Sequence, residues 1–286
     1  MTLSALILTH DRPEEILQCL SSLQEEMENL LEIIILDNGS HPPLRKEDFS
    51  GFAKLTFLYS KKNLGVAAGR NYLAQQARGD LLWFINDDAA LVCQNACTLI
   101  RSYFEQKDLG LISFKVINRF TNEEEYRCIP DRRKQPTSTD LPASYFVGCS
   151  FVMPKVLFIQ LGGFWEPLYY SCEELDLSYR ILESEYSVIR SSSLQVLHSF
   201  SQTENRTSSW IYFNTRNRSW TALRNLPLRY AISQTVLWWT YIGWISLKEK
   251  KFSLFLKAMK DCLQGIGLAY QTRSIISLKT RNGVIS

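Results

Sequence analysis

The sequence lacks the cysteine spacings that mark zinc sites and disulfide frameworks. Its seven cysteines are scattered through 286 residues, and the closest pair, Cys93 and Cys97, lies one helical turn apart inside an apolar pattern. Cysteines that bind zinc or form a disulfide scaffold recur at characteristic short intervals. We therefore expect reduced cysteines in the core of a cytoplasmic protein, because free thiols persist in reducing compartments.

Other features that would assign the chain to a class are also missing. The sequence starts directly with an apolar run, so we expect no signal peptide, which would show a charged n-region and a cleavage site. It contains no Gly-Lys-Ser/Thr phosphate loop, no internal repeat and no low-complexity segment. With 45% hydrophobic residues, the composition is that of a globular protein with one large domain, or a domain and an appendage.

Short apolar runs alternate with helical patterns along the first 116 residues. Apolar residues recur at helical spacing from Ile16 to Leu23 and over roughly residues 94–105. This alternation predicts an α/β fold with a mostly parallel, Rossmann-like sheet that helices cover on both faces. Residues 117–143 are polar and contain three prolines, so we expect a long loop or lid there. The expected strands are residues 3–9, 33–36, 55–59, 81–85, 109–116 and 145–153.

The apolar run at residues 81–85 stops at Asn86, Asp87 and Asp88. In open α/β sheets, ligands bind at the carboxyl ends of the strands. Two adjacent carboxylates there repel each other unless a positive charge lies between them, and a hard divalent cation with a substrate phosphate would supply it. The alternative is that Asp87 and Asp88 cap a helix that starts near Ala89.

Two other predicted strands end in Thr9 and Asp37, which places these side chains at the same edge of the sheet. A nucleotide lying across that edge needs a carboxylate for the base, and Asp37 is the candidate. It also needs close backbone approach near the ribose and phosphates, which Gly65 and Gly69 would permit. The alternative for these glycines is an ordinary role in turns and packing.

A second acidic pair, Glu173 and Glu174, opens a predicted helix that runs to about residue 185. These acids could interact with the helix dipole, or one could act as a general base. Just upstream, Gly163 would let backbone approach a substrate, and Trp165 offers a flat apolar face of the kind on which sugars stack. His198 ends another predicted strand and is either structural or a metal ligand.

Taken together, the motifs closely resemble the family 2 glycosyltransferases of the GT-A fold, particularly the bacterial rhamnosyltransferase-like members. The resemblance covers roughly residues 3–225, and it rests on the order and intervals of the motifs. In order, they are Ile7-Leu8-Thr9, Asp37-Asn38-Gly39-Ser40, Asn63-x-Gly65-x-x-x-Gly69-Arg70-Asn71, Gly79-Asp80 leading to Asn86-Asp87-Asp88, Gly148 through Gly162-Gly163-Phe164, Glu173-Glu174-x-Asp176-Leu177-x-x-Arg180, His198 and Tyr212-x-x-x-Arg216-Asn217.

The resemblance implies roles for individual residues. Asp37 would bind the nucleobase, and Glu174, or else Glu173, would be the catalytic base. Mg²⁺ or Mn²⁺ on the donor diphosphate would be held by Asn86, Asp88 and His198. The implied donor-binding residues are Thr9, Arg12, Asp37, Asn63, Gly65, Arg70, Asn86, Asp87 and Asp88, and the acceptor-binding residues are Trp165 and Gly163.

Three positions depart from the usual family pattern. Asn86 stands at the first position of the Asp-x-Asp motif, Glu174 stands where an Asp is commoner, and Trp165 replaces the acid that often follows Gly-Gly-Phe. The second departure leaves the roles of Glu173 and Glu174 undistinguished. The third departure weakens the inference that Trp165 binds the acceptor.

The implied activity is inverting, metal-dependent transfer of a hexosyl or deoxyhexosyl group to a glycan or lipid-linked acceptor in cell-surface polysaccharide synthesis. The donor would be a UDP-, dTDP- or GDP-linked sugar. We expect no nucleic-acid partner, and an oligomer is possible. One alternative is a sugar-phosphate nucleotidyltransferase, against which the missing N-terminal Gly-rich loop argues. Another is a non-catalytic glycan- or membrane-binding subunit, against which the set Asp88, Glu174 and His198 argues.

The charge changes sign near residue 200. Residues 1–200 contain 19 Lys/Arg and 26 Asp/Glu, whereas residues 201–286 contain 13 and 3. We therefore predict a catalytic domain over 1–225 and a helical appendage over 226–286 that lies on an anionic membrane surface, peripheral on its cytoplasmic face. The apolar stretch at 228–247 is marginal as a spanning helix. We expect the apolar face of the helix from Phe252 to Ile266 to lie in the membrane interface. The alternative is that these helices pack on the catalytic domain or form a dimer contact.

Overall fold

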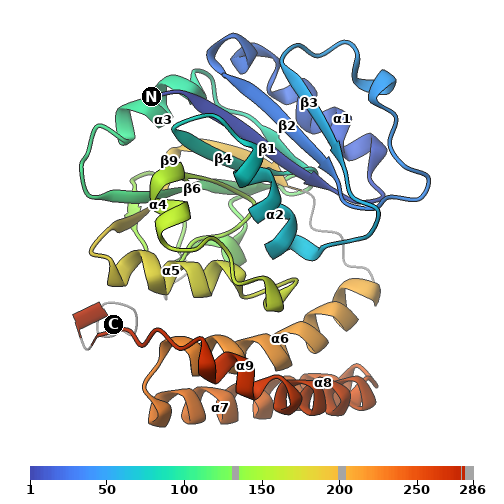
Figure 1. Cartoon of the computed structure of the whole chain (residues 1–286), viewed down its shortest axis with the longest axis vertical. Helices are drawn as coiled ribbons and strands as arrows, with labels where there is room; N and C mark the ends of the chain where they lie inside the picture. The colour runs from blue at the N-terminus through green and yellow to red at the C-terminus, as the bar shows by residue number, and fades with distance from the viewer. Residues whose placement is uncertain (131–134, 199–203, 278, 281–286) are drawn as a thin grey trace.

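A computed structural model describes residues 1–130, 135–198, 204–277 and 279–280. At its centre is a nine-stranded sheet with the order β3-β2-β1-β4-β8-β6-β9-β5, in which β7 also pairs with β9 (Figure 1). The strands are β1 (Leu3–Thr9), β2 (Glu32–Asp37), β3 (Leu55–Tyr59), β4 (Leu81–Asn86), β5 (Ala89–Leu91), β6 (Leu109–Asn118), β7 (Leu141–Pro142), β8 (Ser150–Pro154) and β9 (Ser187–His198).

Strands β3, β2, β1 and β4 are mutually parallel, and β6 is parallel to β9. Strand β8 runs antiparallel between β4 and β6, and the short β5 and β7 run antiparallel to β9. The register pairs Thr9 with Asp37 and Leu8 with Asn86, so these three strands end at one edge of the sheet. The predicted α/β fold with a mostly parallel sheet is confirmed.

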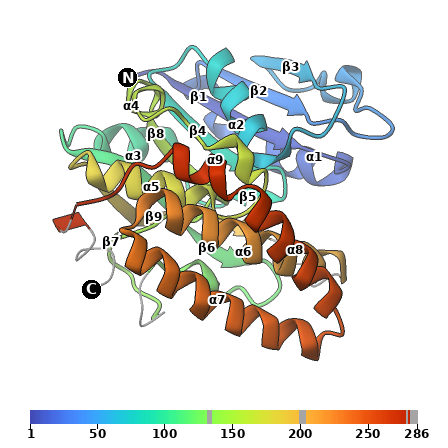
Figure 2. The same cartoon turned by 60° about the horizontal axis from the view of Figure 1, so that its bottom comes forward.

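Helices cover both faces of the sheet (Figures 1 and 2). One buried cluster joins α1 and α3 to the sheet around Leu20 and Ile100, and the other joins α2, α4 and α5 to it around Leu73 and Ile181. Burial of these apolar faces provides the main favourable free energy of the domain. The helices are α1 (Pro13–Ser22), α2 (Gly65–Gln76), α3 (Ala96–Tyr103), α4 (Lys155–Gln160) and α5 (Glu173–Glu183).

One alternative and one local expectation are wrong. No helix starts near Ala89, because Ala89–Leu91 forms strand β5 and pairs with β9 in the register Ala89 to His198. The helix-capping alternative for Asp87 and Asp88 is therefore wrong. Residues 145–149 precede β8 and are not a strand, although Phe146 is buried. Pairing and burial contributed by distant segments override the local pattern at both places.

Four helices form a separate layer below the sheet domain in Figure 1: α6 (Glu204–Asn225), α7 (Leu228–Lys248), α8 (Phe252–Gln264) and α9 (Ile266–Gln271). Helix α6 lies between α5 and the outer helices, and it packs against α7 and α8. Asp176 of α5 links the helical layer to the sheet domain. It accepts hydrogen bonds from Arg224 and Asn225 of α6, both at 2.8 Å. The C-terminal helices are therefore present as expected, while the boundary at residue 225 stays a prediction.

In the described ranges, no helix combines the length and the hydropathy needed to cross a membrane.

Candidate functional site

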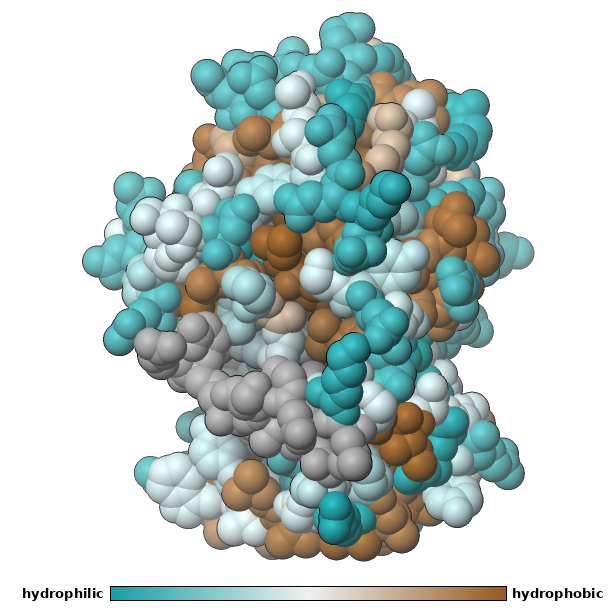
Figure 3. Space-filling model, turned by 90° about the vertical axis from the view of Figure 1, so that its left-hand side faces the viewer, coloured by the Kyte–Doolittle hydropathy of each residue, from teal (hydrophilic) through white to brown (hydrophobic). Residues whose placement is uncertain are grey.

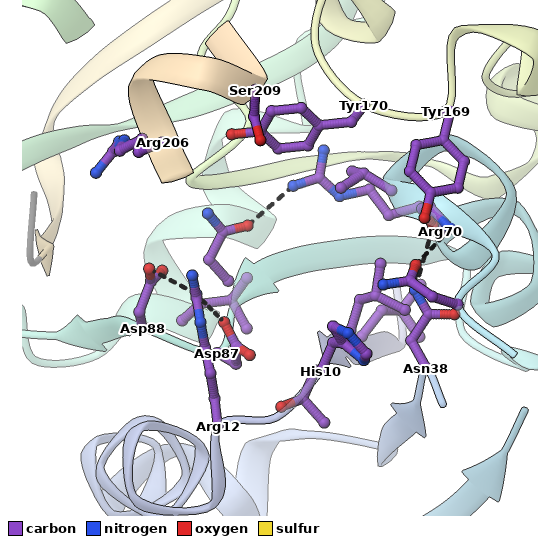
Figure 4. A pocket seen from close by; sticks show the side chains of 18 of the residues that line it. His10, Arg12, Asn38, Arg70, Asp87, Asp88, Tyr169, Tyr170, Arg206 and Ser209 are labelled. Atoms are coloured by element: carbon purple, nitrogen blue, oxygen red, sulfur yellow. Dashed lines mark hydrogen bonds and ion pairs between the residues drawn. The ribbon is translucent and has the colours of Figure 1, made fainter. Parts of the chain in front are cut away.

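A cavity of about 460 Å³ opens where β1 and β4 end (Figure 4). Its lining comes from the sheet edge, from the start of α2, from the turn before α5 and from the first turns of α6. The predicted site residues that line it are Thr9, Arg12, Asn63, Gly65, Arg70, Asn86, Asp87, Asp88 and His198.

Arg12 joins the two carboxylates that follow β4. Its Nη1 donates to Asp87 Oδ1 at 2.9 Å and to Asp88 Oδ2 at 2.8 Å. Arg12 is held there because it immediately precedes α1, which begins at Pro13, a residue suited to the first helical turn. The mutual repulsion predicted for the adjacent aspartates is thus offset by a side chain of the protein itself (Figure 4).

The two aspartates differ in acidity. Burial raises the pKa of Asp87 to about 6, although Arg12 opposes the shift. Burial also acts to raise the pKa of Asp88, but the hydrogen bond from His198 and the electrostatic interactions with His198 and Arg12 outweigh it, so the pKa lies below its usual value. Asp88 is therefore the firmly ionised carboxylate of this pair.

Asp88 and His198 are the residues best placed to hold a metal ion. The pairing of β5 with β9 brings His198 Nε2 to 3.0 Å from Asp88 Oδ1. A carboxylate oxygen and an imidazole nitrogen suit Mn²⁺, and the carboxylate suits Mg²⁺. In the described residues, at this site and elsewhere, no group of three or more His, Cys, Asp or Glu side chains could hold a metal ion. The arrangement therefore fits a metal whose other ligands are diphosphate oxygens and water.

Arg70 faces the second acidic pair at the start of α5. Its Nη1 lies 3.8 Å from Glu173 Oε1 and 3.8 Å from Glu174 Oε1, which is too far for hydrogen bonds. Its Nη2 instead donates to Asn86 Oδ1 at 2.9 Å and to the carbonyl oxygen of Gly148 at 2.6 Å. A Cβ atom on Gly148 would lie 2.1 Å from Glu174 Oε1, so a larger residue there would displace the Glu174 carboxylate.

Burial changes the protonation of Glu173. This side chain is buried, and burial together with the neighbouring Glu174 raises its pKa to about 8, although Arg70 opposes the shift. Glu173 therefore keeps its proton at neutral pH. Glu174 is the more exposed side chain of the two.

The turn that leads into α5 is strained. Tyr169, Ser171 and Cys172 all have positive φ angles, between 63° and 71°, which non-glycine residues rarely adopt. Asn217 of α6, fully buried, holds this turn by donating from Nδ2 to the carbonyl oxygens of Leu168, Tyr170 and Ser171 at 2.7–2.8 Å. The helical layer therefore positions the segment that presents both the acidic pair and the cavity wall.

Gly65 has φ +79°, and a Cβ atom on it would lie 2.5 Å from Tyr169 Cδ2. The backbone N–H of Val66 donates to the carbonyl oxygen of Tyr169 at 2.6 Å, so the start of α2 is fixed against the strained turn. Gly69 differs, because its Cβ would meet Leu8 at 2.6 Å. Gly65 thus shapes the cavity, whereas Gly69 is needed for the packing of α2 on β1.

Five predicted site residues do not line the cavity: Asp37, Gly163, Trp165, Glu173 and Glu174. Asp37 is buried and accepts backbone hydrogen bonds from Ser40 and Leu44, both at 2.9 Å. The two glutamates are nearest to the cavity, since Arg70 lies between them and its floor. The binding and catalytic roles of all five stay predictions.

The acceptor candidates occupy structural positions. Trp165 packs edge-on against Trp220, with 5.9 Å between the ring centroids. The Arg224 guanidinium lies 4.5 Å from the centroid of the Trp165 ring. A Cβ atom on Gly163 would lie 2.6 Å from Asn71 Oδ1. These contacts give both residues a packing role that the sequence motifs do not express.

Several lining residues were not anticipated from the sequence. Asn38 donates from Nδ2 to Asn63 Oδ1 at 3.1 Å, which joins the loops after β2 and β3. Tyr169 stacks on Phe213 with 5.8 Å between ring centroids, so an aromatic wall faces the acidic floor. Asn38 could have been predicted, because it lies within the recognised Asp-Asn-Gly-Ser turn. The aromatic wall could not, because it joins two segments that are distant in the sequence. The other unanticipated residues are His10, Tyr170, Arg206 and Ser209.

Comparison with curated proteins gives three relatives. An uncharacterized protein of Haemophilus influenzae is 29% identical over 157 residues, which cover 51% of this chain and 83% of that protein. A second H. influenzae protein, described as an uncharacterized glycosyltransferase, is 24% identical over 63% of this chain and 62% of its own length. The uncharacterized glycosyltransferase YfnE of Bacillus subtilis is 31% identical over 38% of this chain and 29% of its own length. The chain thus spans less than two thirds of the last two relatives.

Solved structures share the fold at low sequence identity. TarS 1-349 of S. aureus in complex with UDP-GlcNAc has a TM-score of 0.64 and 13% identity, covering 96% of this chain and 84% of TarS 1-349. The mannosyltransferase PcManGT from Pyrobaculum calidifontis, in complex with GDP-Man and Mn²⁺, has a TM-score of 0.58 and 13% identity, with 99% and 83% covered. These likenesses establish the GT-A fold.

The sequence model described as Glycosyl transferase family 2 matches residues 4–162, more than half of the chain. That range contains β1 to β4 and the Asn86-Asp87-Asp88 end of β4, on which the cavity is built. The α/β sheet, the cavity and the order of the motifs agree with this match. The chain belongs to glycosyl transferase family 2.

Proposed function

We propose that the protein transfers a sugar from a nucleoside-diphosphate donor to an acceptor hydroxyl, with inversion at the anomeric carbon. The observation that carries the proposal is that Arg70, which lines the cavity, connects the acidic pair at its wall to a second acidic pair behind it. Asn86 directly precedes Asp87 and accepts a hydrogen bond from Arg70, which faces Glu173 and Glu174. One pair therefore has the chemistry to hold a diphosphate with its metal, and the other has the chemistry to accept a proton.

The donor diphosphate is proposed to lie over Asp88, His198 and Arg12. Asp88 and His198, with Asn86 nearby, would hold Mg²⁺ or Mn²⁺, which when bound supplies positive charge for the leaving diphosphate. Solved neighbours that contain Mn²⁺ with a nucleotide or nucleotide sugar support this choice. Arg12 keeps both aspartates in place, and its guanidinium is available to phosphate oxygens at the cavity.

Proton removal is proposed to fall to Glu174. Its carboxylate takes the proton of the acceptor hydroxyl, the hydroxyl oxygen bonds to the anomeric carbon, and the bond to the nucleoside diphosphate breaks. Glu173 retains its own proton at neutral pH and is therefore not available as the base. Glu174 is also the more exposed of the pair, with 25% of its side chain open to solvent against 3% for Glu173.

The finer assignments are part of the same proposal. The sugar is a hexosyl or deoxyhexosyl group, as in the rhamnosyltransferase-like members, and the donor carries UDP, dTDP or GDP. The acceptor is a glycan or lipid-linked hydroxyl used in cell-surface polysaccharide synthesis. A peripheral position on the cytoplasmic face of the membrane is supported by composition, since residues 226–286 contain nine Lys/Arg and two Asp/Glu.

The test is a screen of nucleotide sugars for metal-dependent release of nucleoside diphosphate by the purified full chain. We expect release with one donor class, more in Mn²⁺ or Mg²⁺ than in chelator, and none with Asp88→Asn. Release of pyrophosphate in place of nucleoside diphosphate would favour a nucleotidyltransferase. Binding of a nucleotide sugar with no turnover towards any hydroxyl or water would favour a non-catalytic subunit.

A further inference from the structure

The outer face of helix α7 exposes a continuous row of large apolar side chains. Spaced at helical intervals over the whole helix, they have between 48% and 62% of their surface exposed. The opposite face of α7 packs inward, where Ile242 is fully buried against Ile211 and Phe255. The row consists of Leu228, Ile232, Val236, Leu237, Tyr241, Trp244 and Leu247.

The two long helices of the predicted membrane-interface segment differ in the side chains that they expose. The apolar face predicted for the segment from Phe252 to Ile266 is divided in α8, because Phe255 is buried whereas Leu256 and Leu263 are exposed. Helix α7, by contrast, turns its most apolar face outward. Figure 1 places α7 at the lower edge of the molecule, and Figure 3 shows apolar side chains gathered along that edge.

Within helix α7 the charges have one sign, although the exposed Glu249 directly follows it. Helix α7 contains no Asp or Glu, and its cations lie at its two ends, at Arg229 and Lys248. Lys248 Nζ sits 3.7 Å from the centroid of the Trp244 ring, so one end combines an aromatic ring with a positive charge. Aromatic and basic side chains at the rim of an apolar surface are typical of segments in a membrane interface.

We propose that the outer face of α7 docks on a lipid bilayer that contains anionic headgroups. Two copies of the chain that met through this face would bring together cations without an acidic residue of α7 to pair with them, whereas lipid phosphates supply the missing charge. The apolar row would enter the boundary between headgroups and acyl chains, where its exposed apolar surface is removed from contact with water. This docking surface deepens the proposed membrane position and is independent of the transfer chemistry.

Docking through α7 leaves the cavity open to acceptors from the same surface. Helix α6 supplies Arg206, Ser209 and Phe213 to the cavity, while α7 and α8 pack on α6 from the other side. One helix layer thus separates the cavity from the bilayer. This placement suits an acceptor whose reacting sugar projects from a lipid anchor.

The experiment is co-sedimentation of the full chain with vesicles of phosphatidylcholine alone or of equal parts phosphatidylcholine and phosphatidylglycerol. Val236→Ser with Leu237→Ser removes two of the most exposed side chains of the row. We expect this pair to weaken partitioning at least about tenfold, because each side chain loses its burial in the interface. The matched control is Val156→Ser with Ile159→Ser on α4, which are equally exposed but far from α7 in sequence, and it should partition like the wild type.

Charge is tested with Arg229→Gln and Lys248→Gln, which should each weaken binding to the anionic vesicles about fivefold at low salt and leave binding to phosphatidylcholine unchanged. The inference is overturned if the wild type ignores anionic vesicles, if the α4 pair loses as much binding as the α7 pair, or if the α7 pair converts a dimer to a monomer. Donor turnover with a soluble acceptor, measured on the same samples, should be unchanged in the α7 pair. A loss there would instead show that this face belongs to the catalytic unit.

Discussion

Two acidic pairs lie close to the cavity, and a single arginine faces each of them. Arg12 contacts Asp87 and Asp88 at hydrogen-bonding distances of 2.9 and 2.8 Å. Arg70, by contrast, stays 3.8 Å from each glutamate because Asn86 and Gly148 engage its other nitrogen. In both pairs burial raises the pKa of one acid, to about 6 for Asp87 and to about 8 for Glu173.

The two pairs therefore differ in how closely an arginine approaches them. Close approach helps to keep the aspartates ionised near neutral pH, which is the state needed beside a cation and a diphosphate. In the second pair, burial and the neighbouring Glu174 leave Glu173 protonated at neutral pH, and the more distant Arg70 does not offset them. From this comparison we expect substitutions in the first pair to affect donor binding and those in the second to affect the proton-transfer step.

The largest effect is expected for Asp88→Asn. The amide removes the charge that would hold the metal and the donor diphosphate, so turnover should fall about a thousandfold or more. The fold should be retained, since Asp88 is half-buried and at a strand end, and circular dichroism checks this. Wild-type turnover that persists in excess chelator would contradict the assignment of a metal to this pair.

The next effect concerns the base. Glu174→Gln should lower the transfer rate about a hundredfold or more, because an amide cannot accept the acceptor's proton. Glu173→Gln should lower it less than about tenfold, since the native side chain is already neutral at neutral pH. Single-turnover rates with saturating donor separate the two variants. An inactive Glu173→Gln beside an active Glu174→Gln would reverse the roles.

A smaller effect is expected at Asn217, which holds the strained turn before the second pair. Asn217→Ala removes three hydrogen bonds to carbonyl oxygens and should lower kcat about tenfold, with little change in the KM for donor. Asn214→Ala is the matched control on the same helix, because Asn214 reaches the turn only through the Ser171 hydroxyl. Equal losses in the two variants would mean that α6 stabilises the fold without positioning the turn.

The smallest effect is on stability. Glu173 keeps its proton in the folded protein up to about pH 8, whereas the unfolded chain releases it above the ordinary value of 4.5. Its contribution to stability is therefore fully present below about pH 4.5 and is lost as the pH rises through 8. Glu173→Gln should leave Tm nearly unchanged at about pH 4.5 and raise it by several degrees at about pH 9. Thermal melts at both pH values check this, and a pH-independent difference would contradict the raised pKa.

Much of the sheet could be predicted because its strands are continuous apolar runs. Leu3–Thr9 and Leu55–Tyr59 match their predicted bounds, and the helix that starts at Glu173 was also found. Strand β5, Ala89–Leu91, was not predicted, because nothing in its own sequence indicates the pairing with β9. Such short pieces take their structure from partners far along the chain.

The site could be predicted where a single segment contains the functional side chains at a strand end. The Asn86-Asp87-Asp88 triplet and His198 were found from polar residues at strand ends, and they meet at the cavity. The aromatic wall of Tyr169 and Phe213 was not found, because it joins residues that lie far apart in the sequence. Which apolar faces of the C-terminal helices are exposed could not be predicted for a related reason, since periodicity identifies an apolar face but not what covers it.

The central claim is that the two acidic pairs divide donor binding from proton transfer. The most direct measurement is calorimetric titration of the preferred nucleoside diphosphate, with and without Mn²⁺, into the wild type, Asp88→Asn and Glu174→Gln. The account predicts that Mn²⁺ tightens binding to the wild type and to Glu174→Gln equally, and that Asp88→Asn loses this Mn²⁺-dependent gain. Loss of the gain in Glu174→Gln, or its survival in Asp88→Asn, would contradict the claim.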